Sequence, residues 1–128
     1  MANVAIQIQS ETDVDNAGQN NTIAYNICYN TKGDDTDAAG ILIDHWTTGS
    51  LVYHNICYNN QGTGITVYNC TNSLFYHNTT YGNSQSGTGT SLTEWDIAST
   101  GNLLDTITLK NNVSQATKAN TYAIKVNT

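Results

Sequence analysis

The sequence GSLVYHNICYN at residues 49–59 returns as NSLFYHNTTYG at residues 72–82, a shift of 23 residues. Residues 21–30 read NTIAYNICYN, which matches the same phrase with one gap opposite His54. A looser copy, DTITLKNNVS, occupies residues 105–114. Repeats of about 20–50 residues are typical of solenoids, in which each unit stacks on its neighbours. The sequence therefore predicts a stacked fold.

A second element lies between these copies. It reads GILIDH at residues 40–45 and GITVYN at residues 64–69, with weaker versions WDIA at 95–98 and YAIKV at 122–126. The opening segment VAIQI at residues 4–8 fits the same place. Apolar residues that alternate with period two indicate strands with one buried face, and no segment shows the apolar stripe of a helix.

Two or three short strands per unit predict one coil of a parallel β-helix. We therefore expect an all-β fold, a single-stranded right-handed parallel β-helix of about four to five coils, with coils about 4.8 Å apart. The right-handed sense follows from the crossover rule for parallel strands. Residues 1–128 form one domain, either a short solenoid or part of a longer one.

The repeats also predict which side chains share a column. On one wall the expected inward columns are Ile23, Leu51, Leu74 and Ile107, then Tyr25, Tyr53, Tyr76 and Leu109. On the other wall they are Ile41 and Ile65, then Ile43, Val67 and Ile97. Asn26, Asn55, Asn78 and Asn111 are expected to form an asparagine ladder at a corner, where stacked amides satisfy backbone groups and each other.

The phrases SLVYHNICYNN and SLFYHNTTYGN, each preceded by a G-I-x-[IV] strand, resemble the right-handed parallel β-helix repeat proteins of the pectin-lyase-like superfold. The resemblance covers nearly the whole chain and implies the fold. It leaves the activity open, because the family contains lyases, hydrolases, epimerases, adhesins and inert scaffolds. Its enzymes generally have more coils and a cap over the first coil. Pectate-lyase-like enzymes typically abstract a proton with an arginine, which this chain lacks.

The charge balance excludes several classes of partner. The formal net charge is −6, and all four basic residues are lysines. Nucleic-acid binding is not expected, because neutralising phosphates requires a cationic patch. No apolar run approaches the length that spans a membrane. The N-terminus lacks the basic start and apolar core of a signal peptide, so the localisation stays open between the cytoplasm and export with a signal removed.

The cysteines are read as structural. Cys28 and Cys57 occupy the same repeat position, with Thr80 next in the column, so we expect small buried side chains stacked between coils. Disulfide geometry between Cys28 and Cys57 is possible, and their redox state is left open. The spacing to Cys70 is wrong for a zinc knuckle.

The densest negative charge lies in one polar loop. Asp34, Asp35 and Asp37 are candidate calcium ligands, because hard cations prefer oxygen. Asp34 and Asp35 are also candidates for paired acid and base catalysis. Gly33-Asp34-Asp35 looks like the G-D-D motif of polygalacturonases, but the N-T-D, G-H-G and R-I-K motifs of that family are missing. The alternative is a solvated loop.

A second candidate site is the outer wall after the strand at residues 41–44. If Ile41 and Ile43 point inward, then Asp44 points outward beside Tyr68. We expect ligand binding at Asp44, Trp46, Tyr68 and Thr66, because aromatic faces pack on sugar rings and carboxylates bond their hydroxyl groups. Asp44, Asp96 and His45 are the catalytic candidates on this wall. The alternative is an ordinary polar wall.

One further pair is singled out by the repeat. His54 and His77 fall in one column, at a turn. Two stacked histidines could share a metal ion or act as acid and base, and the alternative is a pair of polar turn residues.

Two functions remain open. The first is a non-catalytic β-helix module with polysaccharide as its ligand class, which pairs with itself through its end coils as a homodimer or a larger assembly. It accounts for the short length and for strands at both ends that need partners. The alternative is a carbohydrate-active enzyme, a hydrolase or lyase-like protein that uses the acidic residues, with or without calcium.

Overall fold

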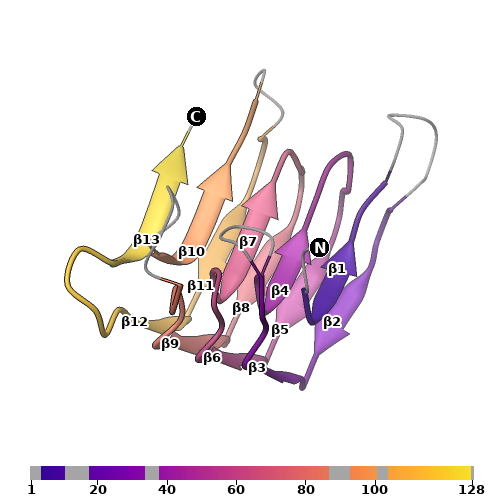
Figure 1. The fold of residues 1–128 in the computed structure, drawn as a ribbon. Helices are drawn as coiled ribbons and strands as arrows, with labels where there is room; N and C mark the ends of the chain where they lie inside the picture. Colours follow the sequence, from indigo (N-terminus) through magenta and orange to yellow (C-terminus); the bar gives the residue numbers. More distant parts are fainter. Residues whose placement is uncertain (1–3, 11–17, 34–37, 87–92, 101–103, 128) are drawn as a thin grey trace.

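The computed structural model describes residues 4–10, 18–33, 38–86, 93–100 and 104–127. This part of the chain holds thirteen short strands in three sheets and no helix, and all strand pairs are parallel (Figure 1). Sheet 1 contains β1 (Ile6–Ile8), β4 (Ile41–Ile43), β7 (Ile65–Tyr68), β10 (Thr93–Ala98) and β13 (Tyr122–Asn127). Sheet 2 contains β2 (Thr22–Ala24), β5 (Leu51–Tyr53), β8 (Leu74–Tyr76) and β11 (Thr108–Lys110). Sheet 3 contains β3 (Ile27–Tyr29), β6 (Ile56–Tyr58), β9 (Thr79–Tyr81) and β12 (Val113–Gln115).

The chain visits sheets 1, 2 and 3 in turn and then returns to sheet 1 one coil further along. Strands β1–β12 therefore make four coils, and β13 begins a fifth at the opposite end from β1 (Figure 1). This is an all-β parallel β-helix, as the repeats predict. The repeat phrase does not form one strand: it bends at its asparagine and supplies one strand to sheet 2 and one to sheet 3.

Sheet 1 confirms the predicted columns. Ile41 pairs with Ile65, and Ile43 pairs with Val67 and then Ile97, so these side chains line up inside the helix. Ile41, Ile43, Ile65 and Val67 have no exposed surface. Glycine precedes β4 and β7 because a side chain would clash there. A Cβ on Gly64 would lie 2.7 Å from Nδ2 of Asn83.

The predicted inward columns of sheet 2 are wrong by one residue in the second and third coils, whereas Ile23, Ile107 and Leu109 pack against the interior as expected. Val52 pairs with Ile23 and Phe75, and Phe75 pairs with Leu109, so these four residues form the inward column. Val52 and Phe75 are fully buried, and the Phe75 ring packs edge-on against Trp95, with ring centroids 5.8 Å apart. Leu51 is exposed instead of inward, and the same shift puts Leu74, Tyr25, Tyr53 and Tyr76 outside the interior column.

The error in sheet 2 comes from the alignment gap that was placed opposite His54. The first two coils align without a gap at a spacing of 29 residues, so Thr22 pairs with Leu51 and Ala24 with Tyr53. Because side chains alternate along a strand, a register error of one residue moves every side chain to the opposite face. Aligning Leu51 with Ile23 because both are hydrophobic therefore assigned an outward-facing residue to the inward column.

The asparagine ladder is confirmed in three coils and corrected in the fourth. Oδ1 of Asn55 accepts the backbone N–H of Asn26, and Oδ1 of Asn78 accepts that of Asn55, at 3.0 and 3.1 Å. The next member is Asn112 and not Asn111, since Oδ1 of Asn112 accepts the N–H of Asn78 at 2.9 Å. Asn111 takes the preceding corner position, in the left-handed region with φ of 50°. The two adjacent asparagines made the alignment ambiguous.

A second ladder, which the sequence analysis missed, closes sheet 3. Oδ1 of Asn60 accepts the N–H of Thr31, and Oδ1 of Asn83 accepts the N–H of Asn60. The last member is Glu94, whose Oε1 accepts the N–H of Asn83 at 2.9 Å. Glu94 has no exposed surface, and this burial raises the pKa of its carboxyl group, although the hydrogen bonds from Asn83 and Gly82 act in the opposite direction.

The cysteine column is confirmed. Cys28 pairs with Cys57, and Cys57 with Thr80, and all three cysteines are buried free thiols. The hydrogen bond between the first two lowers the pKa of Cys28, and the same bond together with burial raises the pKa of Cys57 well above its ordinary value. Burial raises the pKa of Cys70 to about 12. These thiols therefore fill the interior as small apolar groups.

Candidate functional site

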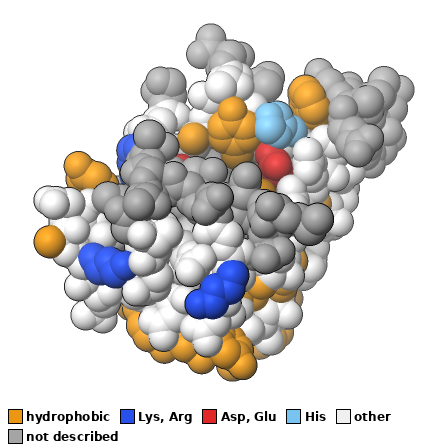
Figure 2. Space-filling model, in the orientation of Figure 1, with side chains coloured by type: hydrophobic (Ala, Val, Ile, Leu, Met, Phe, Trp, Pro, Cys, Tyr) orange, Lys and Arg blue, Asp and Glu red, His pale blue; other side chains and the backbone are white. Residues whose placement is uncertain are grey.

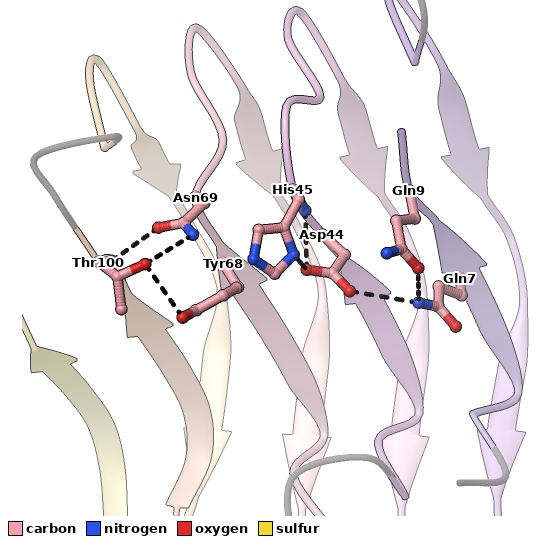
Figure 3. A network of polar contacts seen from close by, with 7 residues as sticks. All are labelled: Gln7, Gln9, Asp44, His45, Tyr68, Asn69 and Thr100. Carbon is pink, nitrogen blue, oxygen red and sulfur yellow. Dashed lines mark hydrogen bonds and ion pairs between the residues drawn. The ribbon is translucent and has the colours of Figure 1, made fainter. Parts of the chain in front are cut away.

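Polar and aromatic side chains gather where the strands of sheet 1 end. Because the strands are parallel, residues at and after their carboxyl ends lie at one edge in consecutive coils. Most are drawn in Figure 3, and Figure 2 views the molecule from the side of sheet 1. We call this set the sheet 1 rim: Gln7, Gln9, Asp44, His45, Trp46, Tyr68, Asn69 and Thr100.

His45 is the centre of the rim. Its ring packs edge-on against Tyr68, with centroids 4.7 Å apart, and lies tilted beside Trp46 at 5.2 Å. Its Nδ1 lies 2.5 Å from Oδ1 of Asp44, an ion pair when the ring is protonated, while the same oxygen accepts the His45 backbone N–H at 2.7 Å. The contacts bring together Asp44, His45, Trp46 and Tyr68, which includes three of the four ligand-binding residues expected from the sequence.

Hydrogen bonds extend the rim in both directions. Gln7 donates through Nε2 to Oδ2 of Asp44 at 3.3 Å and to Oε1 of Gln9 at 2.8 Å. On the other side, the Tyr68 hydroxyl lies 3.3 Å from Oγ1 of Thr100, which also accepts from Nδ2 of Asn69 at 3.1 Å (Figure 3). The rim therefore spans four coils, over about 14 Å at the ordinary strand spacing.

The sequence analysis missed four members of the rim. Gln7 and Gln9 belong to the first coil; Gln9 bonds Gln7, and the contact of Gln7 with Asp44 crosses 37 residues of sequence. Asn69 and Thr100 join across 31 residues, where the repeat spacing changes because of the long insertion before β10. The alternation of β1 carried one usable signal, because Gln7 and Gln9 occupy its outward positions.

Thr66 and Asp96 lie in the column that begins with Gln7, two residues before the register position of Asp44 and Tyr68. Leu42, Thr66 and Asp96 form one column, as expected from the sequence. They are not part of an exposed wall, however, because all three are buried and Asp96 is 5% exposed. The Thr66 hydroxyl bonds that of Thr63, and Asp96 accepts a hydrogen bond from Asn127 at 3.1 Å.

The spacing of Asp44 and Asp96 bears on catalysis. They stand two coils apart and two residues apart along the strand, because Tyr68 pairs with Ala98 and Asp44 follows the Ile43–Val67 pair. Their Cα atoms are therefore about 12 Å apart at ordinary strand spacing. The carboxyl pairs of glycosidases are about 5–10 Å apart. The Cα separation does not fix the distance between the carboxyl groups, but Asp96 is buried beside Asn127 while Asp44 lies on the rim, so the two carboxylates do not form an exposed pair.

The acidic loop cannot be placed against the rim. Asp34, Asp35 and Asp37 all fall outside the described residues. Among the described residues, no group of three or more histidine, cysteine, aspartate or glutamate side chains is arranged to hold a metal ion. Within the same ranges, no helix has the length and apolar character needed to cross a membrane.

A second exposed surface covers sheet 3. Its outward residues include Ile27, Ile56 and Val113, and hydrophobic side chains gather along this lower side of the molecule (Figure 2). Beside them Tyr29, Tyr58 and Tyr81 stack with ring centroids 5.2 Å apart and planes within 5°. Because the faces of these rings cover one another, the stack offers mostly ring edges and hydroxyl groups to a ligand.

The fold defines a class, the parallel β-helix proteins. Comparison with protein families, with curated proteins and with solved structures finds no match for this chain.

Proposed function

We propose that this chain is a non-catalytic β-helix module, of the pectin-lyase-like kind, that binds polysaccharide along the sheet 1 rim. The observation that carries the proposal is the continuous row of amide, carboxylate, imidazole, phenol and hydroxyl groups across four coils. Side chains of these types bond sugar hydroxyl groups, and the indole and phenol rings pack on sugar faces. A row with a regular repeat suits a polymer that also repeats.

The burial of Asp96, which leaves Asp44 without an exposed acidic partner among the described rim residues, supports a binding role over catalysis. Asp44 already accepts three contacts from Gln7 and His45, and only 13% of its side chain is exposed. A carboxylate engaged in this way orients its neighbours and is poorly placed to attack a substrate. The alternative, an enzyme that uses Asp34 and Asp35, rests on residues outside the described ranges.

Thermal melting against a panel of acidic and neutral polysaccharides tests the binding proposal, with calcium and with chelator. A ligand that binds only the folded chain raises the melting temperature. We expect one glycan class to raise it in the wild type and to lose this effect in Tyr68→Ala and Asp44→Asn. Tyr58→Ala, which removes a half-buried tyrosine from sheet 3, is the matched control. No shift with any polysaccharide, or a loss confined to Tyr58→Ala, would contradict the proposal.

We also propose that the module pairs with itself through its end coils. In β13, Tyr122, Ile124 and Val126 are 61%, 47% and 61% exposed. Ile124 and Val126 continue the interior columns of Trp95 and Ile97, yet no further coil of the described chain covers them. A hollow next to them is lined by Ile97, Leu104, Asp105, Thr106, Ile107, Leu109 and Val126.

The open edges of the sheets favour a second copy as the cover. Because all strand pairs are parallel and β1 and β13 lie at opposite ends of sheet 1, the first coil of one copy can stack on the last coil of another and extend all three sheets.

Sedimentation velocity over a range of protein concentrations tests self-association. We expect a dimer or larger species in the wild type and a monomer in Ile124→Lys, because a charge would enter the apolar contact. Ala123→Lys places the same charge on the other face of β13 and should leave the assembly intact. A wild type that stays monomeric at the highest concentration would exclude this contact.

A further inference from the structure

The corner between sheets 2 and 3 places one residue per coil in a left-handed backbone conformation. Tyr25, His54, His77 and Asn111 have φ of 59°, 52°, 53° and 50°. Each directly precedes a member of the asparagine ladder, whose hydrogen bonds fix the backbone there. All four side chains are exposed. The corner is therefore a rigid column of solvent-facing positions, spaced by one coil.

Two of the three histidines in the chain occupy this column in consecutive coils. The rings of His54 and His77 have centroids 5.1 Å apart and planes inclined by 31°. The Tyr25 ring stacks on the other side of His54 at 5.2 Å. Tyr53 and Tyr76 pack edge-on against the two imidazoles, at 5.7 and 5.5 Å. These contacts limit ring rotation and hold the pair together before any ligand arrives.

The backbone conformation at this corner does not require a histidine side chain. The same position holds tyrosine in the first coil and asparagine in the fourth, and His77 Nε2 lies 3.3 Å from Nδ2 of Asn111. Among the described residues neither histidine of the pair contacts a carboxylate, in contrast to His45, which lies against Asp44. Apart from the contact between His77 Nε2 and Asn111, the ring nitrogens of the pair have no hydrogen-bond partner in the described part of the chain.

We propose that His54 and His77 form a two-histidine chelate for a borderline divalent transition-metal ion such as Zn²⁺, Ni²⁺ or Cu²⁺. Neutral imidazole suits these ions, whereas Ca²⁺ and Mg²⁺ prefer oxygen ligands. Two bonds of about 2.1 Å span nitrogens up to about 4.2 Å apart, which small rotations of rings one coil apart can provide. Water completes the coordination sphere. This site lies at the corner between sheets 2 and 3, separate from the sheet 1 rim.

Calorimetric titration of the full chain with NiCl₂ tests the chelate. We expect one ion per chain, and a fall of about tenfold or more in affinity in His54→Asn and in His77→Asn, because each removes one of two ligands. Asparagine suits the left-handed corner, as Asn111 shows, so both variants should fold. The matched control is Thr106→Asn at another left-handed corner with φ of 52°, which should keep the wild-type affinity.

NMR spectra locate the bound ion independently. Paramagnetic Ni²⁺ should broaden the ring signals of His54 and His77 at substoichiometric amounts and spare those of His45. The proposal is overturned if the wild type shows no binding, if one ion joins two chains, or if either variant retains the wild-type affinity. Binding that survives both substitutions would indicate other ligands, such as the cysteine thiols, and would equally overturn it.

Discussion

Replacing Asn55 by alanine should remove the most connected member of the first ladder. Oδ1 of Asn55 accepts the backbone N–H and the side-chain amide of Asn26, both at 3.0 Å. Its Nδ2 donates to the carbonyls of Ile23 and Tyr53 and to Oδ1 of Asn78, each at 3.0 Å. The side chain is almost fully buried, so water cannot replace these partners.

The expected cost follows from these contacts. A net hydrogen bond contributes about 1 kcal/mol, and a buried group left without a partner costs about 1–3 kcal/mol. Loss of the amide leaves the Asn26 N–H and the Ile23 carbonyl to be satisfied, so we expect destabilisation by about 3–5 kcal/mol. For a domain of this size that lowers the melting temperature by about 10–20 °C.

Urea unfolding followed by circular dichroism measures this cost directly. Asn21→Ala is the matched control, because Asn21 lies outside both ladders and its substitution should cost about 0.5 kcal/mol or less. If Asn55→Ala proves as stable as Asn21→Ala, the hydrogen bonds of the asparagine ladder do not stabilise the stack of coils.

Three further predictions concern the interior. Phe75→Ala should lower the free energy of unfolding by about 3–5 kcal/mol, and Leu74→Ala by less than about 1.5 kcal/mol, because only Phe75 points inward. A larger loss for Leu74→Ala than for Phe75→Ala would support the register expected from the sequence. Burial raises the pKa of Glu94 above 4.5, so its contribution to stability is greatest below that pH and is lost as the pH rises through the folded-state value. The stability of the wild type relative to Glu94→Gln should therefore fall as the pH rises above 4.5, and a constant or rising difference would refute this. Cys70, with a pKa of about 12, should react with iodoacetamide at neutral pH only after unfolding, as followed by mass spectrometry; rapid labelling of the native chain would contradict its burial.

The sequence predicts the stacking but not every register. The glycine-led strands of sheet 1 repeat with the same spacing of apolar residues, so Ile41, Ile65 and their neighbours could be assigned from the pattern alone. In sheet 2 apolar residues occupy both faces, and Leu51 is as hydrophobic as Val52. The contact that decides the register is the hydrogen bond between Asn26 and Asn55, because it fixes the spacing between the first two coils at 29 residues.

The sequence predicted the aromatic and acidic residues of the candidate site but not the amide side chains that bond to them. Asp44, His45 and Tyr68 follow from strand alternation within two neighbouring coils. Gln7 and Thr100 join them through contacts across loops of unequal length, which no repeat spacing predicts. The exposure of Asp96 was misjudged because an outward direction from the sheet does not guarantee access to water.

The most direct test of the central claim, a parallel β-helix in the stated register, is a set of NMR contacts through space. We expect cross-peaks from the Phe75 ring to the Val52 methyl groups and to the Trp95 ring, because these residues meet in the interior. Cross-peaks from the Trp95 ring to Leu74 in place of Phe75 would contradict the register, and with it the placement of the sheet 1 rim and the histidine pair.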